Sequence, residues 1–256
     1  MIGFFSSTGG ESGTSWRSQI GSSIPTWGVL DLGELIGKDH GTSISSHRGG
    51  DLQGSQTRHQ RHHSQDAARP PQIVHPKDAG GIIIAYAGIS SGDTVVEAGG
   101  AGSGGALTLF LANVVGPQGG RVISYEVRED HAEIARKNVE MAGFSDRVTI
   151  KLGNIYEGIE EDHADHIVLD LPQPEKVLPH AIEVLRPGGY FVAYTPPCAN
   201  QVHRFFQAFQ EYRGGEFYKP RVVEVLVREH EVKRECMRPK TTMLAHTGYI
   251  TFLRKL

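Results

Sequence analysis

The sequence predicts an α/β fold in which a mostly parallel sheet is covered by helices on both faces. Strand and helix patterns alternate over residues 76–256, a glycine-rich turn follows the first clear strand, and two strand-like runs end the chain. Alternation indicates parallel strands joined by crossover helices, and the final two runs predict an antiparallel edge. Strands are expected at 94–98, 121–126, 147–151, 166–170, 189–195, 222–232 and 246–253. Helices are expected at 77–87, 105–115, 129–142, 174–185 and 200–212.

Length and composition limit the function. The 256 residues suffice for one α/β domain with a small appendage. The formal net charge of −3 provides no general basic field, so contact with nucleic acid needs a local patch or an assembly. An apolar run of membrane-spanning length and a signal peptide are both lacking, which predicts a cytoplasmic protein that does not contact membranes.

The two cysteines and the histidine-rich stretch 58–63 do not predict a metal site. Cys198 and Cys236 lack metal-ligand spacing and are too few for a disulfide framework, and nothing near 58–63 completes a ligand set. Two buried thiols are the simpler interpretation, and a bridge within or between subunits stays open. We therefore expect no bound metal.

The first 75 residues form a separate region, and residues 76–256 form the second domain. Segments 4–27 and 50–70 are rich in polar residues and show almost no apolar periodicity, so they are predicted to be disordered or translated out of frame. With GC-rich codons, a shift of two bases across 4–27, or removal of one G at codons 49–50, restores the apolar alternation. We favour reading-frame errors in G/C runs, which resequencing of the gene would test.

The glycine-rich turn is the first candidate binding feature. It follows strand 94–98 and precedes helix 105–115, an order that brings backbone N–H groups close to a ligand because glycine has no Cβ. Alone, such a turn fits NAD, a flavin or S-adenosyl-L-methionine (SAM) equally well. The candidate cofactor-binding residues here are Glu97, Gly99, Gly102, Ser103 and Gly104.

Three further residues, all C-terminal to the glycine-rich turn, are candidates for holding an adenosine. Glu126 ends the second strand, 29 residues after Glu97, where a carboxylate can accept hydrogen bonds from both ribose hydroxyls. His131 begins the next helix, where it could flank the ligand, and Asn154 follows the third strand, where it could face the adenine amino group. The alternatives are a solvated carboxylate, a surface histidine and an ordinary turn residue.

Asp170 is the main candidate for catalysis. It ends an apolar strand and precedes Leu171-Pro172-Gln173-Pro174, whose two prolines stiffen the loop. Methyltransferases that act on amino groups of nucleic acids carry an Asp/Asn-Pro-Pro-aromatic loop here, and this chain shares the position and the carboxylate. The alternative is a helix N-cap. Residues 185–189, Leu-Arg-Pro-Gly-Gly before an apolar strand, are typical of SAM-dependent methyltransferases and rare in dehydrogenases. Together these features predict the Rossmann-like fold of a class I SAM-dependent methyltransferase.

The chain resembles the archaeal tRNA adenine-N1 methyltransferases that modify adenine 58 of the T-loop. The resemblance covers residues 28–48 and 71–256. Its motifs are Gln72-Ile73-Val74-His75-Pro76-Lys77-Asp78, Tyr125-Glu126-Val127-Arg128-Glu129-Asp130, Leu169-Asp170-Leu171-Pro172-Gln173-Pro174, Cys236-Met237-Arg238-Pro239 and His246-Thr247-Gly248-Tyr249-Ile250-Thr251-Phe252. The reframed N-terminal segments resemble the small N-terminal β-domain of the family.

This resemblance implies a homotetramer that uses SAM to form 1-methyladenosine in tRNA, at adenine 58 and in some archaeal members also at 57. Carried over by position, the residues that would hold SAM are Gly102, Ser103, Gly104, Glu126, His131 and Asn154. Gln72 and His75 would line the same cleft, Asp170 would orient the target base, and Tyr194 would help form the base pocket.

The chain departs from the family pattern by single extra residues. These are Gly81, Gly100, Gly105, Gly120 and Pro197. The extra glycines beside Ser103 place the geometry of the SAM loop in question.

Asp170 would accept a hydrogen bond from the exocyclic amine of an extruded adenine, aiming N1 at the methyl group. A methyltransferase of proteins or small molecules is the first alternative, since it would share the SAM residues. A non-catalytic RNA-binding subunit is the second, although it would be expected to lose the SAM loop and Asp170. A dehydrogenase fits least well.

Overall fold

The computed structural model describes residues 43–45, 51–53, 73–196, 198–212 and 216–256, in two units, Met1–Asp66 and Ala67–Leu256. In the first unit, β1 (Ser43–Ser45) pairs antiparallel with β2 (Asp51–Gln53). Segment 50–70 was expected to be disordered or translated out of frame, and its described part, residues 51–53, is the strand β2. Segment 4–27 lies outside the described residues. The reading-frame hypothesis and the domain boundary at residue 75 stay predictions.

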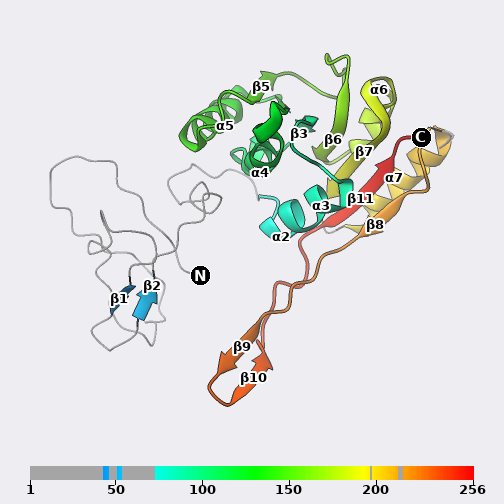
Figure 1. Ribbon diagram of the computed structural model, residues 1–256. Coiled ribbons are helices and arrows are strands. Elements are labelled where there is room, and N and C mark those ends of the chain that lie inside the picture. The colour runs from blue at the N-terminus through cyan, green and yellow to red at the C-terminus, as the bar shows by residue number, and fades with distance from the viewer. Residues whose placement is uncertain (1–42, 46–50, 54–72, 197, 213–215) are drawn as a thin grey trace, which may run out of the picture. The chain divides into compact units, whose positions relative to one another are not determined.

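The second unit contains a seven-stranded sheet in the order β5-β4-β3-β6-β7-β11-β8 (Figure 1). The first five of these strands run parallel, and β11 runs antiparallel to both of its neighbours. Dinucleotide-binding sheets have the order 3-2-1-4-5-6, and here one antiparallel strand is inserted before the last. The predicted sheet with an antiparallel edge is confirmed. The strands are β3 (Thr94–Ala98), β4 (Arg121–Glu126), β5 (Val148–Leu152), β6 (Ala164–Asp170), β7 (Leu185–Thr195), β8 (Arg221–Val223) and β11 (Tyr249–Arg254).

Helices cover both faces of the sheet because successive strand residues point to opposite sides. Val95 packs in one apolar core with α4 and with the helical segment before β3, whereas Val96 packs in a second core with α6 and α7. The helices are α2 (Pro76–Asp78), the π-helix η2 (Ala79–Ile84), α3 (Ala85–Ala87), the 3-10 helix η3 (Ala101–Ser103), α4 (Ala106–Val115), η4 (Gly116–Gln118), α5 (Glu129–Ala142), η5 (Pro174–Val177), α6 (Leu178–Val184) and α7 (Ala199–Glu211).

The segment 77–87 is helical as predicted, but its centre is a π-helix that contains Gly81. A π-turn holds one residue more than an α-turn, so it accommodates a single inserted residue without breaking the helix. The extra residue expected at Gly81 therefore has a place in the fold.

Two predictions near the C-terminal end are wrong. The helix expected at 174–185 and the strand expected at 189–195 leave a turn between them, but β7 already begins at Leu185, with a pairing irregularity opposite Ala164 and His166. The single strand expected at 222–232 is divided, because the chain leaves the sheet after Val223. Alternation of side chains cannot show where a strand leaves its sheet, since an isolated hairpin has the same period.

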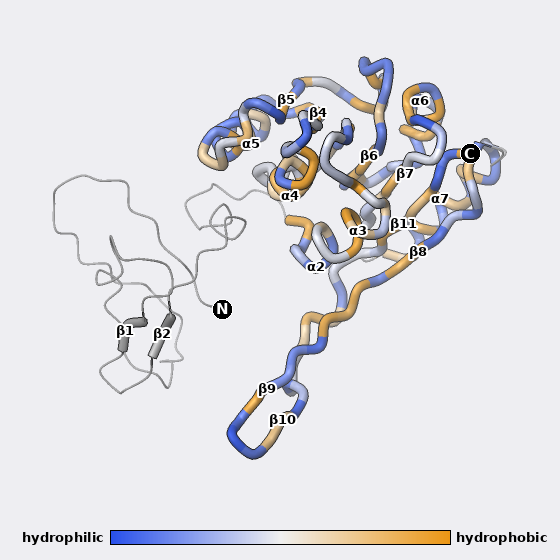
Figure 2. The backbone as a smooth tube through the Cα atoms, in the orientation of Figure 1, coloured by the Kyte–Doolittle hydropathy of each residue, from blue (hydrophilic) through white to orange (hydrophobic). Residues whose placement is uncertain are grey.

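Residues 224–248, here called the arm, extend away from the sheet (Figure 1). Their outer part is a hairpin of β9 (His230–Lys233) and β10 (Cys236–Pro239), with Lys233 opposite Cys236. Figure 2 shows hydrophobic and hydrophilic stretches alternating along the arm. Several large apolar side chains there are solvent-exposed, between 41% and 77%. They are Leu226, Val227, Val232, Met237, Met243 and Leu244.

Candidate active site

The glycine-rich turn joins β3 to η3 and lies against the end of β6. Gly99 has φ +91°, and a Cβ on it would lie 2.0 Å from the carbonyl oxygen of Asp170. Only glycine fits this close approach of two backbones. The turn therefore brings the predicted binding loop and the predicted catalytic residue together.

Glu97 is fully buried and holds the glycine-rich turn through hydrogen bonds. Its Oε1 accepts a hydrogen bond from the backbone N–H of Gly100 at 2.5 Å, and its Oε2 accepts bonds from the hydroxyls of Thr108 (3.0 Å) and Ser124. Burial raises the pKa of Glu97 to about 7. With both oxygens engaged inside the protein, Glu97 shapes the loop, which differs from the direct ligand contact that the sequence suggested.

Two of the extra glycines occupy positions where a side chain would collide. A Cβ on Gly100 would lie 2.0 Å from Oε1 of Glu97, and one on Gly120 would lie 2.5 Å from the carbonyl oxygen of Val115. Gly105, with φ +82°, forms the N-cap of α4. The extra glycines are thus compatible with the loop, while Pro197 lies outside the described residues.

Glu126 and His131 face the backbone of Gly102. Oε1 of Glu126 accepts hydrogen bonds from the N–H groups of Val127 (2.9 Å) and Arg128 (3.0 Å). Its Oε2 lies 4.0 Å from Nδ1 of His131 and would be 3.1 Å from a Cβ on Gly102. Nε2 of His131 is buried without a partner among the described residues.

A buried polar atom without a partner is unfavourable unless a ligand completes it. The unpaired nitrogen of His131, the carboxylate oxygen of Glu126 and the open backbone of Gly102 therefore form a group of polar atoms that is available to a ligand.

Ser103 and Gly104 serve the turn itself. The hydroxyl of Ser103 donates to the carbonyl oxygen of Gly100 at 2.8 Å, and the carbonyl oxygen of Gly104 accepts from Nδ2 of Asn138 at 2.7 Å. Both residues are buried, and Gly104 has φ +79°. Their contribution to a ligand would be the backbone conformation of the loop.

Asn154 and His75 form local caps. Asn154 donates from Nδ2 to Glu157 (2.8 Å) and accepts at Oδ1 from the N–H of Tyr156 (3.1 Å), the turn arrangement that was its alternative interpretation. His75 is the N-cap of α2 and accepts from the N–H of Lys77 at 3.3 Å. Gln72 lies outside the described residues.

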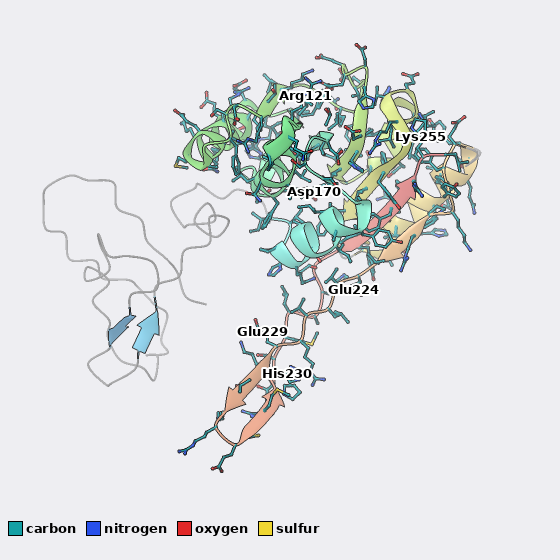
Figure 3. The ribbon with its side chains drawn as sticks, in the orientation of Figure 1. Arg121, Asp170, Glu224, Glu229, His230 and Lys255 are labelled. Carbon is teal, nitrogen blue, oxygen red and sulfur yellow. The ribbon has the colours of Figure 1, made fainter. Side chains whose placement is uncertain are left out.

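Asp170, labelled in Figure 3, ends β6, which lies beside β7 in the sheet (Figure 1). In the register of these two strands Asp170 lies opposite Tyr194. Its carboxylate has no hydrogen bond or ion pair with any residue that the structure describes, and burial raises its pKa to about 7. The N-cap of the next helix is Gln173, so the interpretation of Asp170 as a helix cap is wrong. An unpaired, poorly solvated carboxylate is typical of a functional site.

Sequence reasoning missed a buried network behind Tyr194. Asp78 is fully buried, and its Oδ2 accepts hydrogen bonds from the hydroxyls of Thr247 (2.6 Å) and Tyr194 (3.5 Å). Lys77 contacts Oδ1 of Asp78 at 2.9 Å. Burial, and next the charge of Asp78, raise the pKa of Tyr194 and keep its hydroxyl protonated. The available signal in the sequence was the adjacent pair of Lys77 and Asp78 at the start of a helix. Thr247, which donates to Asp78, lies 169 residues further along the chain.

Both cysteines are exposed and free, so the interpretation of Cys198 and Cys236 as buried thiols is wrong. Within the described ranges, His, Cys, Asp and Glu side chains form no group of three or more that could hold a metal ion. The helices in these ranges are all too short or too polar to cross a membrane.

Comparison with known proteins identifies the relatives of this chain. The family described as "tRNA methyltransferase complex GCD14 subunit" matches residues 64–238. A relative from Methanocaldococcus jannaschii, named tRNA (adenine(57)-N(1)/adenine(58)-N(1))-methyltransferase TrmI, is 38% identical over 205 residues, which cover 70% of each chain.

Two solved structures are similar to this one. A SAM-dependent O-methyltransferase from Thermotoga maritima has a TM-score of 0.77 at 32% identity, covering 90% of this chain and 83% of its own. The tRNA (m1A58) methyltransferase TrmI from Aquifex aeolicus has a TM-score of 0.76 at 27% identity, covering 91% and 88%. The predicted class I methyltransferase fold is confirmed.

Proposed function

The chain belongs to the GCD14 family of tRNA methyltransferase subunits, and on this basis we propose that it methylates N1 of adenine 58 in the T-loop of tRNA. SAM is the methyl donor, and adenine 57, which the name of the Methanocaldococcus relative includes, is a second target. The observation that carries the proposal is the free carboxylate of Asp170 at the carboxyl end of β6, beside the glycine-rich turn.

The adenosine half of the site is formed by Gly102, Glu126 and His131. Oε2 of Glu126 would accept hydrogen bonds from the ribose hydroxyls, and the unpaired Nε2 of His131 would bind the same ligand. SAM supplies a methyl group on a positively charged sulfur, which an incoming nitrogen can take in line. The chain supplies orientation, and a correctly held pair of reactants can gain several orders of magnitude in rate.

Asp170 orients the target base. N1 of adenine already carries a lone pair, so no base is required to create the nucleophile. The carboxylate accepts a hydrogen bond from the exocyclic amine, and it stabilises the positive charge that develops on the ring as the methyl group arrives. Tyr194, opposite Asp170 in the sheet, forms one wall of the base pocket. The adenine must leave its stack to reach this position.

We also propose that the protein is a homotetramer whose arm packs against a second copy. The arm exposes Val232 (77%) and Met237 (70%), together with four further large apolar side chains. Apolar side chains gathered in this way on an extended hairpin are typical of a protein–protein contact. A single copy, with a net charge of −3, has no general basic field. Assembly would bring basic side chains of several copies together into a local positive surface for tRNA.

The second candidate function is O-methylation of a small molecule, which the described activity of the Thermotoga structure favours. A hydroxyl nucleophile needs a base to remove its proton, and Asp170 would then be a general base. Incubation with labelled SAM and three acceptors, namely tRNA, total protein and a catechol, separates these functions. We expect label in tRNA; label in the catechol with unmodified tRNA would overturn the proposal.

A further inference from the structure

Asp78 is a charged residue in the interior for which the proposed mechanism provides no role. It ends α2 and is fully buried, and the side chain of Lys77 beside it is only 7% exposed. A buried ion pair is costly unless further hydrogen bonds satisfy its remaining atoms. The partners of this pair therefore show what the pair holds in place.

Both ends of the arm are fastened to the pair. Nζ of Lys77 donates to the carbonyl oxygen of Val225 (2.7 Å), near the start of the arm, and to the hydroxyl of Thr247 (2.6 Å), near its end. Thr247 in turn donates to Oδ2 of Asp78 at 2.6 Å. Lys77 and Asp78 thus fix the base of the arm against α2.

The same contacts confine Tyr194 from two sides. Its hydroxyl lies 3.5 Å from Oδ2 of Asp78, at the outer limit of a hydrogen bond. Next to Thr247, a Cβ on Gly248 would lie 2.6 Å from Cζ of Tyr194 and 2.7 Å from the carbonyl oxygen of Thr195. The absence of a side chain at Gly248 lets the returning end of the arm rest directly on the Tyr194 ring.

We propose that Asp78 is a positioning residue for methyl transfer: it holds Tyr194 beside Asp170 and links that placement to the base of the arm. This inference rests on the proposed function, because it takes Tyr194 as a wall of the base pocket. Asp78 acts through Tyr194 and does not touch the substrate. Replacing Asp78 should therefore lower the efficiency of the reaction with tRNA and leave the affinity for SAM unchanged.

The test is a double-mutant cycle of Asp78→Asn and Tyr194→Phe in the full-length, assembled protein. Each single variant is expected to lower kcat/KM for tRNA about tenfold, while the Kd for SAM, measured by calorimetry, stays within about twofold of the wild type. The kcat/KM of the double variant should be no lower than that of the less active single variant, because the two changes interrupt one contact.

Three results would overturn the inference. They are losses that multiply in the double variant, full activity of Tyr194→Phe, and a Kd for SAM that rises in proportion to the loss of kcat/KM. If Asp78→Asn does not fold, Asp78→Glu replaces it in the cycle, since it keeps the negative charge beside Lys77 and shifts the carboxylate away from the Tyr194 hydroxyl. Multiplying losses in that second cycle would be equally decisive.

Asp93 offers a matched control. It is an aspartate just before β3, at the opposite edge of the sheet from Asp170, and it accepts a hydrogen bond from the N–H of Ser90 at 2.7 Å. Its side chain also lies 3.3 Å from Nε2 of His166, and it makes no hydrogen bond or ion pair with Tyr194 or Asp78 among the described residues, so the effects of Asp93→Asn and Tyr194→Phe should multiply. A similar lack of additivity in this control pair would show general loss of folding and contradict a specific link.

The wild-type reaction separates failure of the inference from failure of the proposed function. If wild-type protein leaves tRNA unmethylated, the proposed function is wrong, and the contact is then tested by the same cycle in free energies of unfolding. Non-additive free energies of Asp78→Asn and Tyr194→Phe would support the link of the two residues without reference to activity, and additive ones would contradict it.

Discussion

Asp170 and Tyr194 are direct partners in the register of β6 and β7, at the carboxyl ends of adjacent parallel strands. Ligands of open α/β sheets bind at this edge. The carboxylate of Asp170 (Figure 3) has no hydrogen bond or ion pair among the described residues. The hydroxyl of Tyr194 donates to Asp78. The pair presents an acceptor and an aromatic wall to the same side, which suits a flat base with an amino group.

The first prediction concerns Glu126. Glu126→Gln should weaken SAM binding about tenfold or more, because the amide loses the charge that strengthens hydrogen bonds from the ribose hydroxyls. Titration calorimetry with SAM measures this. Glu129→Gln is the matched control, since Glu129 is exposed and pairs only with Arg136 among the described residues, at 2.8 Å. Equal weakening in both variants would contradict the assigned role of Glu126.

The second prediction concerns pH and activity. Burial raises the pKa of Asp170 to about 7, so the carboxylate that accepts from the adenine amine is fully formed only above neutral pH. Single-turnover methylation of tRNA under saturating SAM should therefore rise through pH 7 and level off about one unit higher. A rate that is flat between pH 6 and 8 in the wild type would count against an ionised Asp170 in the reaction.

The third prediction concerns pH and stability. Because the folded pKa of Asp170 lies above its ordinary value of 3.8, the folded state binds more protons than the unfolded state between these two pH values. Stability from this group is present at low pH and is lost as the pH rises through 7. Asp170→Asn removes that loss, so it should unfold at a higher temperature than the wild type at pH 8.

Calorimetric melting at pH 5 and pH 8 checks the third prediction. The advantage of Asp170→Asn should shrink at pH 5, although Glu97, whose pKa is also raised to about 7, retains a similar dependence in both proteins. Glu97→Asp is an unsuitable control because it would break three hydrogen bonds. Asp146→Asn is suitable, since Asp146 is exposed beside Arg147 and its pKa is lowered by that contact. A melting point of Asp170→Asn at or below the wild type at pH 8 would refute the prediction.

The fourth prediction concerns the arm. Val232→Asp combined with Met237→Asp should reduce the assembly to smaller species, because two charges would enter an apolar contact between copies. Light scattering coupled to size-exclusion chromatography measures the molar mass. Met141→Asp is the control, as Met141 is 66% exposed on α5 and outside the arm. An unchanged mass in the arm variant would remove the arm from the interface.

Local sequence patterns predicted the parts of the fold that local chemistry determines. β3 and β4 begin and end where predicted, because each contains β-branched residues and follows a glycine turn, and a second glycine turn ends β3. The pattern could not locate the end of β8 at Val223, since alternation continues into the arm, which lies outside the seven-stranded sheet. Nor could it show the π-turn at Ala79–Ile84, which depends on how one extra residue is absorbed inside a helix.

The candidate site was predicted where its residues end strands. Glu126 and Asp170 both occupy the carboxyl edge of the sheet, as parallel topology requires. Glu97 also ends a strand region, yet its side chain points inward, and sequence alone does not distinguish the two directions. The network of Asp78 with Thr247 was out of reach because it joins residues at opposite ends of the domain.

The most direct measurement is position-resolved methylation of a T-loop transcript by wild-type protein and by Asp170→Ala, together with the Kd for SAM of each. We expect 1-methyladenosine at position 58 with the wild type, a rate lower by about two or more orders of magnitude with Asp170→Ala, and nearly equal affinities for SAM. Near-normal methylation by Asp170→Ala, or an unmodified adenine 58 with the wild type, would contradict it.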